Sequence, residues 1–358
     1  MSTIRAAVCR AFGEPLTIED VRIAPPQGRA VEVTLEACAV CHSDISYADG
    51  IWGGHLPAVY GHEAAGRVTA VGDRVAGIDL GDRVIVTLIR ACGTCPPCAA
   101  GRPTGCETPG GPAPLSLSDG SPLLAAMNCG AFAEKVVVDQ SQIAKVPDDM
   151  PADVASLLSC GVITGVGAVV NAAGLRPGQD AVVIGAGGVG LNAIQGARIA
   201  GARRIVAVDM TEGKLADAAA FGATDGILAT DDAPWQQLVE KIGRKADAVF
   251  VTVGAIPAYD SAPRYLSPGG KVVMVGMPAS GAMSTYEPDV FASLGQGMVG
   301  SKMGDVVIAR DIPWLVDLYQ QGRLKLDELV SGRWSLDQIN EAIADTRSGA
   351  ARRNVIVF

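Results

Sequence analysis

Four cysteines lie in one short stretch of this chain that is rich in proline and glycine. They are Cys92, Cys95, Cys98 and Cys106, with the spacing C-x2-C-x2-C-x7-C. Four thiolates this close together can complete a tetrahedral zinc shell without a ligand from another segment. A redox pair of the C-x-x-C type is the alternative, but it leaves two of the four cysteines without a role. The pattern predicts a structural zinc ion that folds this loop and takes no part in turnover.

Two further cysteines and one histidine, in three separate segments of the chain, are candidate ligands of a second metal ion. They are Cys41, His62 and Cys160. Two thiolates and one imidazole leave one tetrahedral position open on a zinc ion, which is typical of a catalytic site. Taken singly, a cysteine is more often a small buried apolar residue. Nothing in the spacing alone joins Cys160 to the other two.

A glycine motif between two β-branched runs indicates a different chemistry. Residues 181–184 read as a buried parallel strand, and G-x-G-x-x-G follows at Gly185, Gly187 and Gly190. The first glycine permits a tight turn, the second lets the backbone approach a pyrophosphate, and the third lets a helix pack against the strand. With 44 glycines in the chain, the motif alone is weak, so the order of the elements around it decides.

That order is the one a dinucleotide requires. Residues 191–200 have a helical composition, and the helix N-terminus, with Gly188 and Val189, offers N–H groups and a positive dipole end to phosphates. Residues 203–208 form a second strand, which Asp209 closes. A carboxylate there accepts hydrogen bonds from the adenosine ribose and repels a 2′-phosphate, so NAD is favoured over NADP.

Strands and helices continue to alternate beyond this point. The runs 246–253 and 271–275 are further strands, and each is followed by a glycine. Such strands suit a sheet whose carboxyl ends face a ligand, which makes Val253 a cofactor-binding candidate. Lys214 is a second candidate for the ribose, and a solvated helix lysine is the alternative.

The first 90 residues have another pattern. Runs such as 30–36, 65–71 and 82–88 alternate or are β-branched, and glycine and proline separate them, as in a barrel-like antiparallel domain. Residues 107–129 read as a loop, and residues 151–170 read as a helix whose second part is broken by glycines. A length of 358 residues favours two domains.

Composition excludes several classes of protein. Hydrophobic residues make up 49% and charged residues 19%, which suits a buried α/β protein and argues against disorder. The net charge of −9, without a basic cluster, argues against nucleic-acid and anionic-membrane partners. No signal peptide and no transmembrane run of ~18 residues is expected. Nine cysteines without an export signal indicate thiols and metal, hence a cytoplasmic location.

Together these residues resemble the zinc-dependent medium-chain alcohol dehydrogenases, with a long-form, class III-like layout, over essentially the whole chain. The resemblance joins Cys160 to the catalytic zinc and implies NAD, two zinc ions per subunit and a homodimer, with a tetramer as the alternative. It also implies an α/β fold: a Rossmann domain with a doubly wound parallel sheet, plus a discontinuous, β-rich GroES-like catalytic domain. The implied domains are a first catalytic part at 1–161, the NAD-binding domain at 162–302 and a catalytic return segment at 303–358.

The resemblance assigns roles around the catalytic zinc. Glu63 is the acid beside the metal that acts as a transient ligand; a buried, paired carboxylate is the alternative. Asp44 accepts the second ring N–H of His62 and so orients it, although an aspartate also favours an exposed turn. Ser43 is the hydroxyl that bonds the alcohol and starts a proton relay.

It also assigns roles toward the cofactor. His42 and Arg353 are cationic contacts to the NAD pyrophosphate; for Arg353 an ordinary surface arginine is the alternative. Thr164 lies where the family has a threonine near the nicotinamide, and it reads equally as a helix-facing hydroxyl. The implied activity is reversible NAD-dependent oxidation of a primary alcohol to the aldehyde.

Departures from the family pattern bear on the substrate. Ser46 replaces a relay histidine of some long-form relatives, so the relay ends on another group. The glutathione-dependent formaldehyde dehydrogenases share the closest layout, but their acidic pair is replaced by Gly50 and Trp52. Trp52, Leu88 and Met127 indicate an apolar slot for medium-chain or aromatic alcohols, with plain core packing as the alternative. Oxidation of a thiol–aldehyde adduct is the alternative activity, and a non-catalytic zinc ribbon is a third reading.

Overall fold

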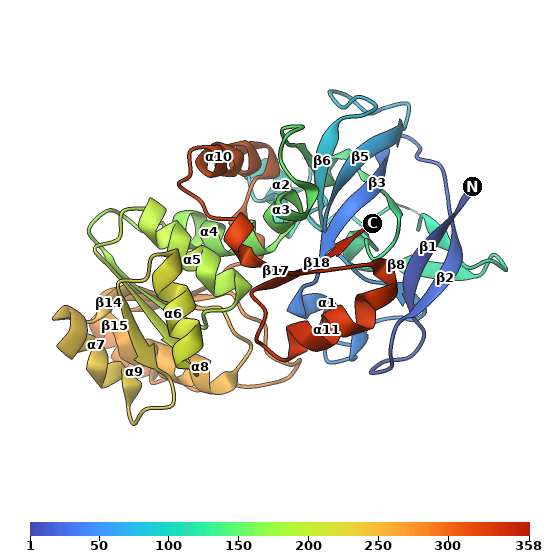
Figure 1. Ribbon diagram of the computed structural model, residues 1–358. Helices are drawn as coiled ribbons and strands as arrows, with labels where there is room; N and C mark the ends of the chain where they lie inside the picture. Colours follow the sequence, from blue (N-terminus) through green and yellow to red (C-terminus); the bar gives the residue numbers. More distant parts are fainter. Residues whose placement is uncertain (112) are drawn as a thin grey trace. The chain divides into compact units, whose positions relative to one another are not determined.

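The computed structural model describes residues 1–111 and 113–358 and divides the chain into two compact units (Figure 1). The first unit contains Met1–Cys160 and Val307–Phe358, and the second unit contains Gly161–Val306. The first unit is therefore discontinuous in sequence. The expected boundaries, after residues 161 and 302, lie one residue (161 − 160) and four residues (306 − 302) from the observed ones.

The second unit is built on a six-stranded parallel sheet with the order β13-β12-β11-β14-β15-β16. Its strands are β11 Asp180–Ile184, β12 Arg204–Asp209, β13 Asp225–Leu228, β14 Ala246–Val251, β15 Leu266–Met274 and β16 Gly297–Gly300. All five residues of β11 are buried, as expected for a parallel strand covered on both faces. The strand order reverses between β11 and β14, which is the arrangement of a Rossmann fold.

Helices connect these strands. They are α4 Gly161–Gly167, α5 Gly188–Ile199, α6 Glu212–Phe221, α7 Pro234–Ile242, α8 Ile256–Ser261 and α9 Pro288–Leu294, with the π-helix η5 Ala168–Ala173 and the 3₁₀ turns η6 Ala262–Tyr265 and η7 Met303–Asp305. The expectation of a glycine-broken segment before residue 170 was wrong, because α4 is a continuous helix. A Cβ on Gly165 would lie 2.4 Å from the carbonyl oxygen of Val189, so this glycine lets α4 pack closely on α5.

Among its described residues, the first unit contains a closed barrel of five strands and a second, seven-stranded sheet. The barrel strands are β1 Ser2–Cys9, β2 Thr17–Ile23, β4 Ala58–Val59, β7 Leu115–Ser116 and β8 Pro122–Ala125. The sheet strands are β3 Ala30–Ala39, β5 Glu63–Val71, β6 Arg83–Thr87, β9 Lys135–Asp139, β10 Ile143–Lys145, β17 Val330–Trp334 and β18 Arg353–Val357. Within the described residues of 107–129, β7 and β8 correct the expectation of a loop; residue 112 lies outside the description.

The first unit also contains helices. They are α1 His42–Ala48, α2 Pro96–Ala99, α3 Ala152–Ser156, α10 Ile308–Gln320 and α11 Ile339–Arg347, with the 3₁₀ turns η1 Pro103–Gly105, η2 Ala126–Asn128, η3 Gln140–Gln142, η4 Leu157–Ser159, η8 Asp327–Leu329 and η9 Leu336–Gln338. In the described part of the chain, no single helix is long and apolar enough to cross a membrane; one bent pair, α3–η4 with α4–η5, meets that criterion only jointly.

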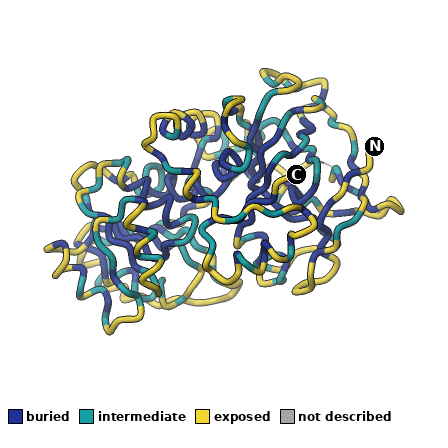
Figure 2. The backbone as a smooth tube through the Cα atoms, viewed as in Figure 1, coloured by how far each residue is buried: buried dark blue, intermediate teal, exposed yellow. Residues whose placement is uncertain are grey.

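The return segment completes the central sheet of the first unit. Strand β18 pairs with β3, with Val355 opposite Ala39, and Figure 1 shows the two strands side by side although they come from opposite ends of the chain. Buried residues run along the strands of each unit (Figure 2). The sheet therefore fixes the position of residues that lie about 300 apart in the sequence, and the candidate site lies at its edge.

Candidate active site

Three predicted metal ligands converge in the first unit. Strands β3 and β5 are antiparallel, with Ala39 opposite Glu63, so the residues that follow β3 meet those that precede β5. This register brings Cys41 next to His62, and Cys160 joins them after η4. All three side chains are buried, and their ligand atoms lie within 4.8 Å of one another, together with a carboxylate oxygen of Glu63.

A neighbouring residue anchors the cysteine that comes from furthest along the chain. The hydroxyl of Ser159 is fully buried and donates to the carbonyl oxygen of Ala64, at 3.0 Å, on strand β5. The bond fixes η4 against the strand that begins at Glu63, and Cys160 is the next residue. Sequence reasoning did not identify this role of Ser159, although the residue stands directly before a predicted ligand.

The orientation of the histidine is set by a buried carboxylate. Asp44 is 1% exposed and accepts from His62 Nδ1 at 2.9 Å, from the Gly61 amide at 2.9 Å and from the Cys41 amide at 3.1 Å. An N–H on Nδ1 leaves the lone pair on Nε2, which is buried and has no hydrogen-bond partner among the described residues. Such an orphaned nitrogen beside two thiols fits a metal ligand.

The two thiols are also suited to a cation. A hydrogen bond with Cys160, supported by His62 and the charge of Arg353, holds the pKa of Cys41 well below its usual value. The same bond and burial raise the pKa of Cys160. One thiolate therefore forms readily and opposes the second, so a bound divalent cation is what lets both ionise. Two sulfurs and one nitrogen are the donor set zinc prefers.

An ion pair buried beside this set involves two residues that were predicted separately. Arg353 Nη2 donates to Glu63 Oε2, and both side chains are buried. Glu63 Oε1 has no hydrogen-bond partner among the described residues. Burial raises the pKa of Glu63 to about 7, although the guanidinium charge opposes the rise. The alternative reading of Arg353 as a surface arginine is wrong; its contact with the NAD pyrophosphate stays a prediction.

The predicted relay residues lie on the first turn of α1. Cys41 is the N-cap of this helix, so His42 and Ser43 follow directly after a metal ligand. His42 is exposed and Ser43 is half-buried. The relay residues therefore lie where they can be reached by solvent or ligand, whereas Asp44 in the same turn is enclosed.

The four remaining ligand candidates form a separate centre. The ligand atoms of Cys92, Cys95, Cys98 and Cys106 also lie within 4.8 Å of one another. Hydrogen bonds from Thr108 and from backbone amides lower the pKa of Cys92 to about 5, whereas burial and the neighbouring sulfurs raise that of Cys98 to about 11. Four thiolates cannot coexist here without a cation, which fits a structural zinc.

In the second unit the glycine turn has the predicted conformation. Gly185 has φ +97°, and a Cβ on Gly190 would lie 1.7 Å from the Gly185 carbonyl oxygen. A Cβ on Gly187 would meet nothing within 4 Å, so the backbone there is open to a ligand. Gly187 is the N-cap of α5, whose first residues are Gly188 and Val189. The turn therefore offers free amides at a helix N-terminus, which fits a pyrophosphate.

Two residues at the end of β14 support this turn. The hydroxyl of Thr252 donates to the carbonyl oxygens of Ile184 at 3.0 Å and Gly185 at 2.7 Å. The side chain of Val253 fills the space that a Cβ on Gly185 would need. Sequence reasoning singled out Val253 and missed Thr252, whose signal is a hydroxyl at the carboxyl end of a parallel strand.

Three further cofactor-binding candidates belong to the second unit. Asp209 accepts from the amides of Ala186 at 2.6 Å and Met210 at 2.7 Å, which places its carboxylate at the glycine turn. Lys214 is half-buried on α6. Thr164 is buried on α4, and its hydroxyl lies 3.8 Å from the sulfur of Met303.

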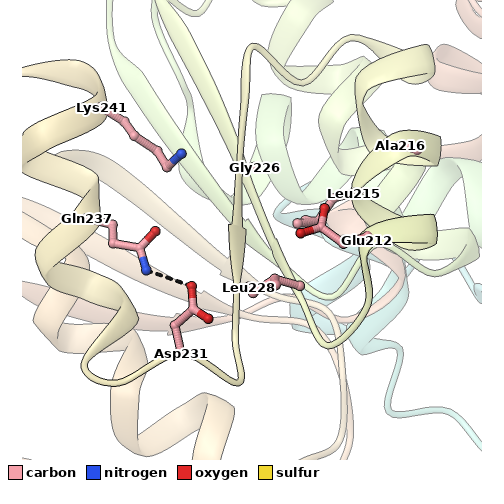
Figure 3. A pocket seen from close by; sticks show the side chains of 8 residues that line it. All are labelled: Glu212, Leu215, Ala216, Gly226, Leu228, Asp231, Gln237 and Lys241. Atoms are coloured by element: carbon pink, nitrogen blue, oxygen red, sulfur yellow. Dashed lines mark hydrogen bonds between the residues drawn. The ribbon is translucent and has the colours of Figure 1, made fainter.

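A cavity of about 450 Å³ lies elsewhere in the second unit, between α6, β13 and α7 (Figure 3). Gln237 donates to Asp231 at 2.8 Å across one side of it, and Lys241 and Glu212 contribute opposite charges to its wall. None of the predicted site residues lines this cavity. This cavity is therefore distinct from the predicted cofactor site.

A parallel sheet with a dinucleotide-type glycine turn in one unit, and two cysteine-based metal centres in the other, define a zinc-binding dehydrogenase. Family models agree: the alcohol dehydrogenase GroES-like domain matches residues 27–148, and the zinc-binding dehydrogenase model matches residues 188–321. The chain belongs to the zinc-dependent medium-chain alcohol dehydrogenase family, as the sequence predicted. The predicted fold class is likewise confirmed.

Individual relatives extend over the whole chain. An NDMA-dependent alcohol dehydrogenase of Amycolatopsis methanolica is 34% identical over 99% of this chain and 98% of its own length. A geraniol dehydrogenase of Castellaniella defragrans is 36% identical over 99% of this chain and 97% of its own. The crystal structure of benzyl alcohol dehydrogenase from Acinetobacter calcoaceticus is 30% identical, with a TM-score of 0.94 over 100% of both chains.

Proposed function

We propose that this protein oxidises a primary, apolar or aromatic alcohol to the aldehyde with NAD, reversibly, at a zinc ion held by Cys41, His62 and Cys160. The observation that carries the proposal is the buried, unpartnered Nε2 of His62 facing two thiols. A second, structural zinc is assigned to the 92–106 loop. The glycine turn and Asp209 of the second unit are assigned to NAD.

The side chains around the metal ligands have separate roles in the proposed reaction. When bound, zinc supplies a Lewis acid that favours loss of the alcohol proton, and NAD supplies the hydride acceptor. Asp44 keeps the proton on His62 Nδ1, so that Nε2 stays a ligand. Ser43 takes the alcohol proton and passes it outward, and the exposed His42 is the next group along α1. The Glu63–Arg353 pair keeps a carboxylate beside the metal ligands without an unpaired buried charge.

Two relatives support an apolar substrate, because one is named a geraniol dehydrogenase and the other a benzyl alcohol dehydrogenase. Trp52 is half-buried and packs edge-on against Tyr47, with ring centroids 5.1 Å apart. Gly50 and Trp52 leave no acidic pair at the positions where glutathione-dependent relatives carry one. This argues against the glutathione–formaldehyde adduct, whose oxidation remains the second candidate because a probable S-(hydroxymethyl)glutathione dehydrogenase is 34% identical to this chain.

The deciding experiment is a turnover panel with ethanol, octanol, geraniol, benzyl alcohol and formaldehyde plus glutathione, each with NAD and with NADP. The proposal expects the largest kcat/KM with an apolar or aromatic alcohol and NAD. Because one relative is NDMA-dependent, each reaction is run with and without NDMA. Turnover of the glutathione adduct alone would support the second candidate, and no turnover of any alcohol would contradict both the substrate and the metal assignment.

Removing the carboxylate of Asp209 is expected to shift the cofactor preference. In Asp209→Ala the ribose hydroxyls lose an ionised acceptor and a 2′-phosphate loses a repelling charge, so the ratio of kcat/KM for NAD over NADP should fall about 10- to 100-fold. Asp209→Asn is the matched control, because it keeps an oxygen for the Ala186 amide. If both variants keep the wild-type ratio, Asp209 does not select the cofactor.

A homodimer is the proposed assembly, with a tetramer as the alternative. Exposed apolar side chains gather in one segment of the second unit, and no residue of α9 is buried. The exposed residues are Met277, Met283, Tyr286, Leu294 and Met298. Strand β16, which carries Met298, is an edge strand, and only Glu287 and Asp289 bring charge to residues 276–301. The segment is thus mainly apolar and has an open strand edge, which suits contact with a second copy.

A charge placed on that surface should weaken the assembly. We expect Met298→Glu to shift the dimer toward monomer, with a dissociation constant raised about 100-fold, because two like charges would meet near the twofold axis. Analytical ultracentrifugation over a concentration series measures this. Leu80→Glu, at an exposed apolar residue of the first unit, is the control. Equal dissociation constants for both variants would place the interface elsewhere.

A further inference from the structure

Two non-glycine residues of the first unit have a left-handed backbone side by side. Met127 has φ +51° and Asn128 has φ +59°. Side chains other than glycine rarely adopt this conformation, because it is strained, and it persists only where surrounding contacts impose it. The turn they form, η2 with Cys129, includes one of the three residues that the sequence indicated for the apolar slot.

One buried side chain imposes this conformation. Gln142 is 1% exposed, and its amide nitrogen donates to the carbonyl oxygens of Thr87 and Asn128, each at 3.0 Å. Its Oε1 accepts from the Asp139 amide at 3.2 Å. Its amide nitrogen also lies 3.8 Å from the sulfur of Cys129. Every polar atom of this side chain is therefore used, and its bonds join the end of β6 to the strained turn.

A second bond runs between the same two segments. The side-chain amide of Asn128 donates to the carbonyl oxygen of Leu88 at 3.3 Å. Leu88 and Met127, the two slot residues that these segments carry, are both half-buried and pack against the apolar core of the first unit. We call these bonds of Gln142 and Asn128 the clamp. The clamp fixes two slot residues, Leu88 and Met127, relative to each other.

The clamped segments lie next to the metal ligands. Strands β5 and β6 are antiparallel, with Glu63 opposite Thr87, so Leu88 lies on the side of His62. The chain after the turn runs beside the same segment, since the Ala131 amide donates to the Gly61 carbonyl oxygen at 2.9 Å. A shift of this turn would therefore change the surroundings of the catalytic centre without moving a ligand.

We propose that Gln142 is a positioning residue that sets substrate-size selectivity by holding the strained Met127–Asn128 turn against the end of β6. This inference rests on the proposed function for its kinetic consequence, but the positioning itself is independent of it. Replacing Gln142 with leucine removes this side-chain donor from the carbonyl oxygens of Thr87 and Asn128, so the turn relaxes and Met127 leaves its place. The slot then accepts alcohols with less discrimination by size.

The first measurement tests the positioning without any turnover. In protein labelled with ¹³C at the methionine methyl groups, the Met127 resonance is assigned by its loss in Met127→Leu. Gln142→Leu is expected to shift or broaden this resonance while the methionines of the second unit keep theirs. An unchanged Met127 resonance in a folded Gln142→Leu protein overturns the proposal, whatever the enzyme oxidises.

The second measurement tests the consequence. In Gln142→Leu the ratio of kcat/KM for benzyl alcohol over ethanol should change about tenfold, mainly through KM, with zinc content unchanged. Met127→Gly removes both the strain and the side chain and should change the ratio similarly, and the double variant should add nothing further. A lower melting temperature with an unchanged ratio would show that Gln142 is only structural.

A milder variant covers the case in which Gln142→Leu does not fold. Asn128→Gly keeps the left-handed backbone without strain and removes only the bond to Leu88. It should give a smaller change in the same direction. If both the Met127 resonance and the kcat/KM ratio stay at their wild-type values, the clamp is contradicted. If wild-type protein oxidises neither alcohol, the proposed function fails while the methyl resonance still decides the positioning.

Discussion

Replacing Cys41 with serine is expected to remove one of two zinc ions per chain and to lower kcat/KM for alcohol oxidation by roughly 10³-fold or more. A serine hydroxyl does not ionise near neutral pH and is a poor zinc ligand, so the centre loses a donor. The effect is large because the metal contributes strongly to proton loss: zinc lowers the pKa of a bound water to about 7. Elemental analysis and NADH absorbance measure the two results.

A matched control separates loss of the metal from loss of a buried thiol. Cys9 is also fully buried, and its thiol donates to the Ala11 carbonyl oxygen at 3.4 Å, but it lies outside both clusters. Cys9→Ser keeps a donor in place and should retain both zinc ions and most of the activity. Two zinc ions and wild-type turnover in Cys41→Ser would refute the catalytic assignment.

The second large effect concerns stability instead of turnover. Cys106→Ser is expected to release the structural zinc and lower the melting temperature of the first unit by about 10 °C or more. Metal binding provides much of the folding free energy of such a loop, which has little apolar surface of its own to bury. Zinc content should fall to one ion per chain, with Cys41, His62 and Cys160 still occupied.

Calorimetry with and without a chelator, and limited proteolysis, follow this change. Cleavage is expected between residues 90 and 110, where the loop opens. The catalytic zinc should persist at a temperature below the transition, so residual turnover per folded chain is expected. If dithiothreitol, and not zinc removal, changes the melting temperature, the alternative redox reading of the cysteine pairs is the correct one.

Local patterns could be predicted from the sequence because neighbouring residues determine them. The turn at Gly185 and Gly190 needs only a strand, a glycine and a helix in order, and the four-cysteine loop closes on itself. Thr211, the N-cap of α6, and Gly222, its C-cap with φ +116°, are likewise local signals that mark the ends of their helix. Each of these features involves few residues, and the local backbone conformation alone explains why that residue type is found there.

Long-range contacts could not be predicted in this way. Cys160 was joined to Cys41 only through family resemblance, because no local pattern spans 119 residues (160 − 41). The pairing of Arg353 with Glu63 depends on the register of β18 on β3, which leaves no trace near either residue. The family resemblance assigned Arg353 to the cofactor, whereas the fold shows that its side chain pairs with the buried Glu63.

Short elements were the other source of error. Strand β7 has two residues and β8 begins at a proline, so neither has the alternation by which a strand is recognised. The glycines of α4 were read as breakers, because the contacts that require them come from distant residues: Gly165 packs against Val189 of α5, and Gly167 packs against Gly304. In both cases tertiary contacts outweighed local propensity.

The late return of β18 has a consequence for biosynthesis. Residues 37–39 of β3 acquire their β18 partners only when residues 355–357 have emerged from the ribosome, whereas every strand of the second unit has been translated by residue 300. The second unit can therefore fold on the nascent chain while residues 37–39, next to Cys41, still have no β18 partner. Metal insertion at that centre is favoured after translation has passed Arg353, and the four-cysteine loop can load its ion much earlier.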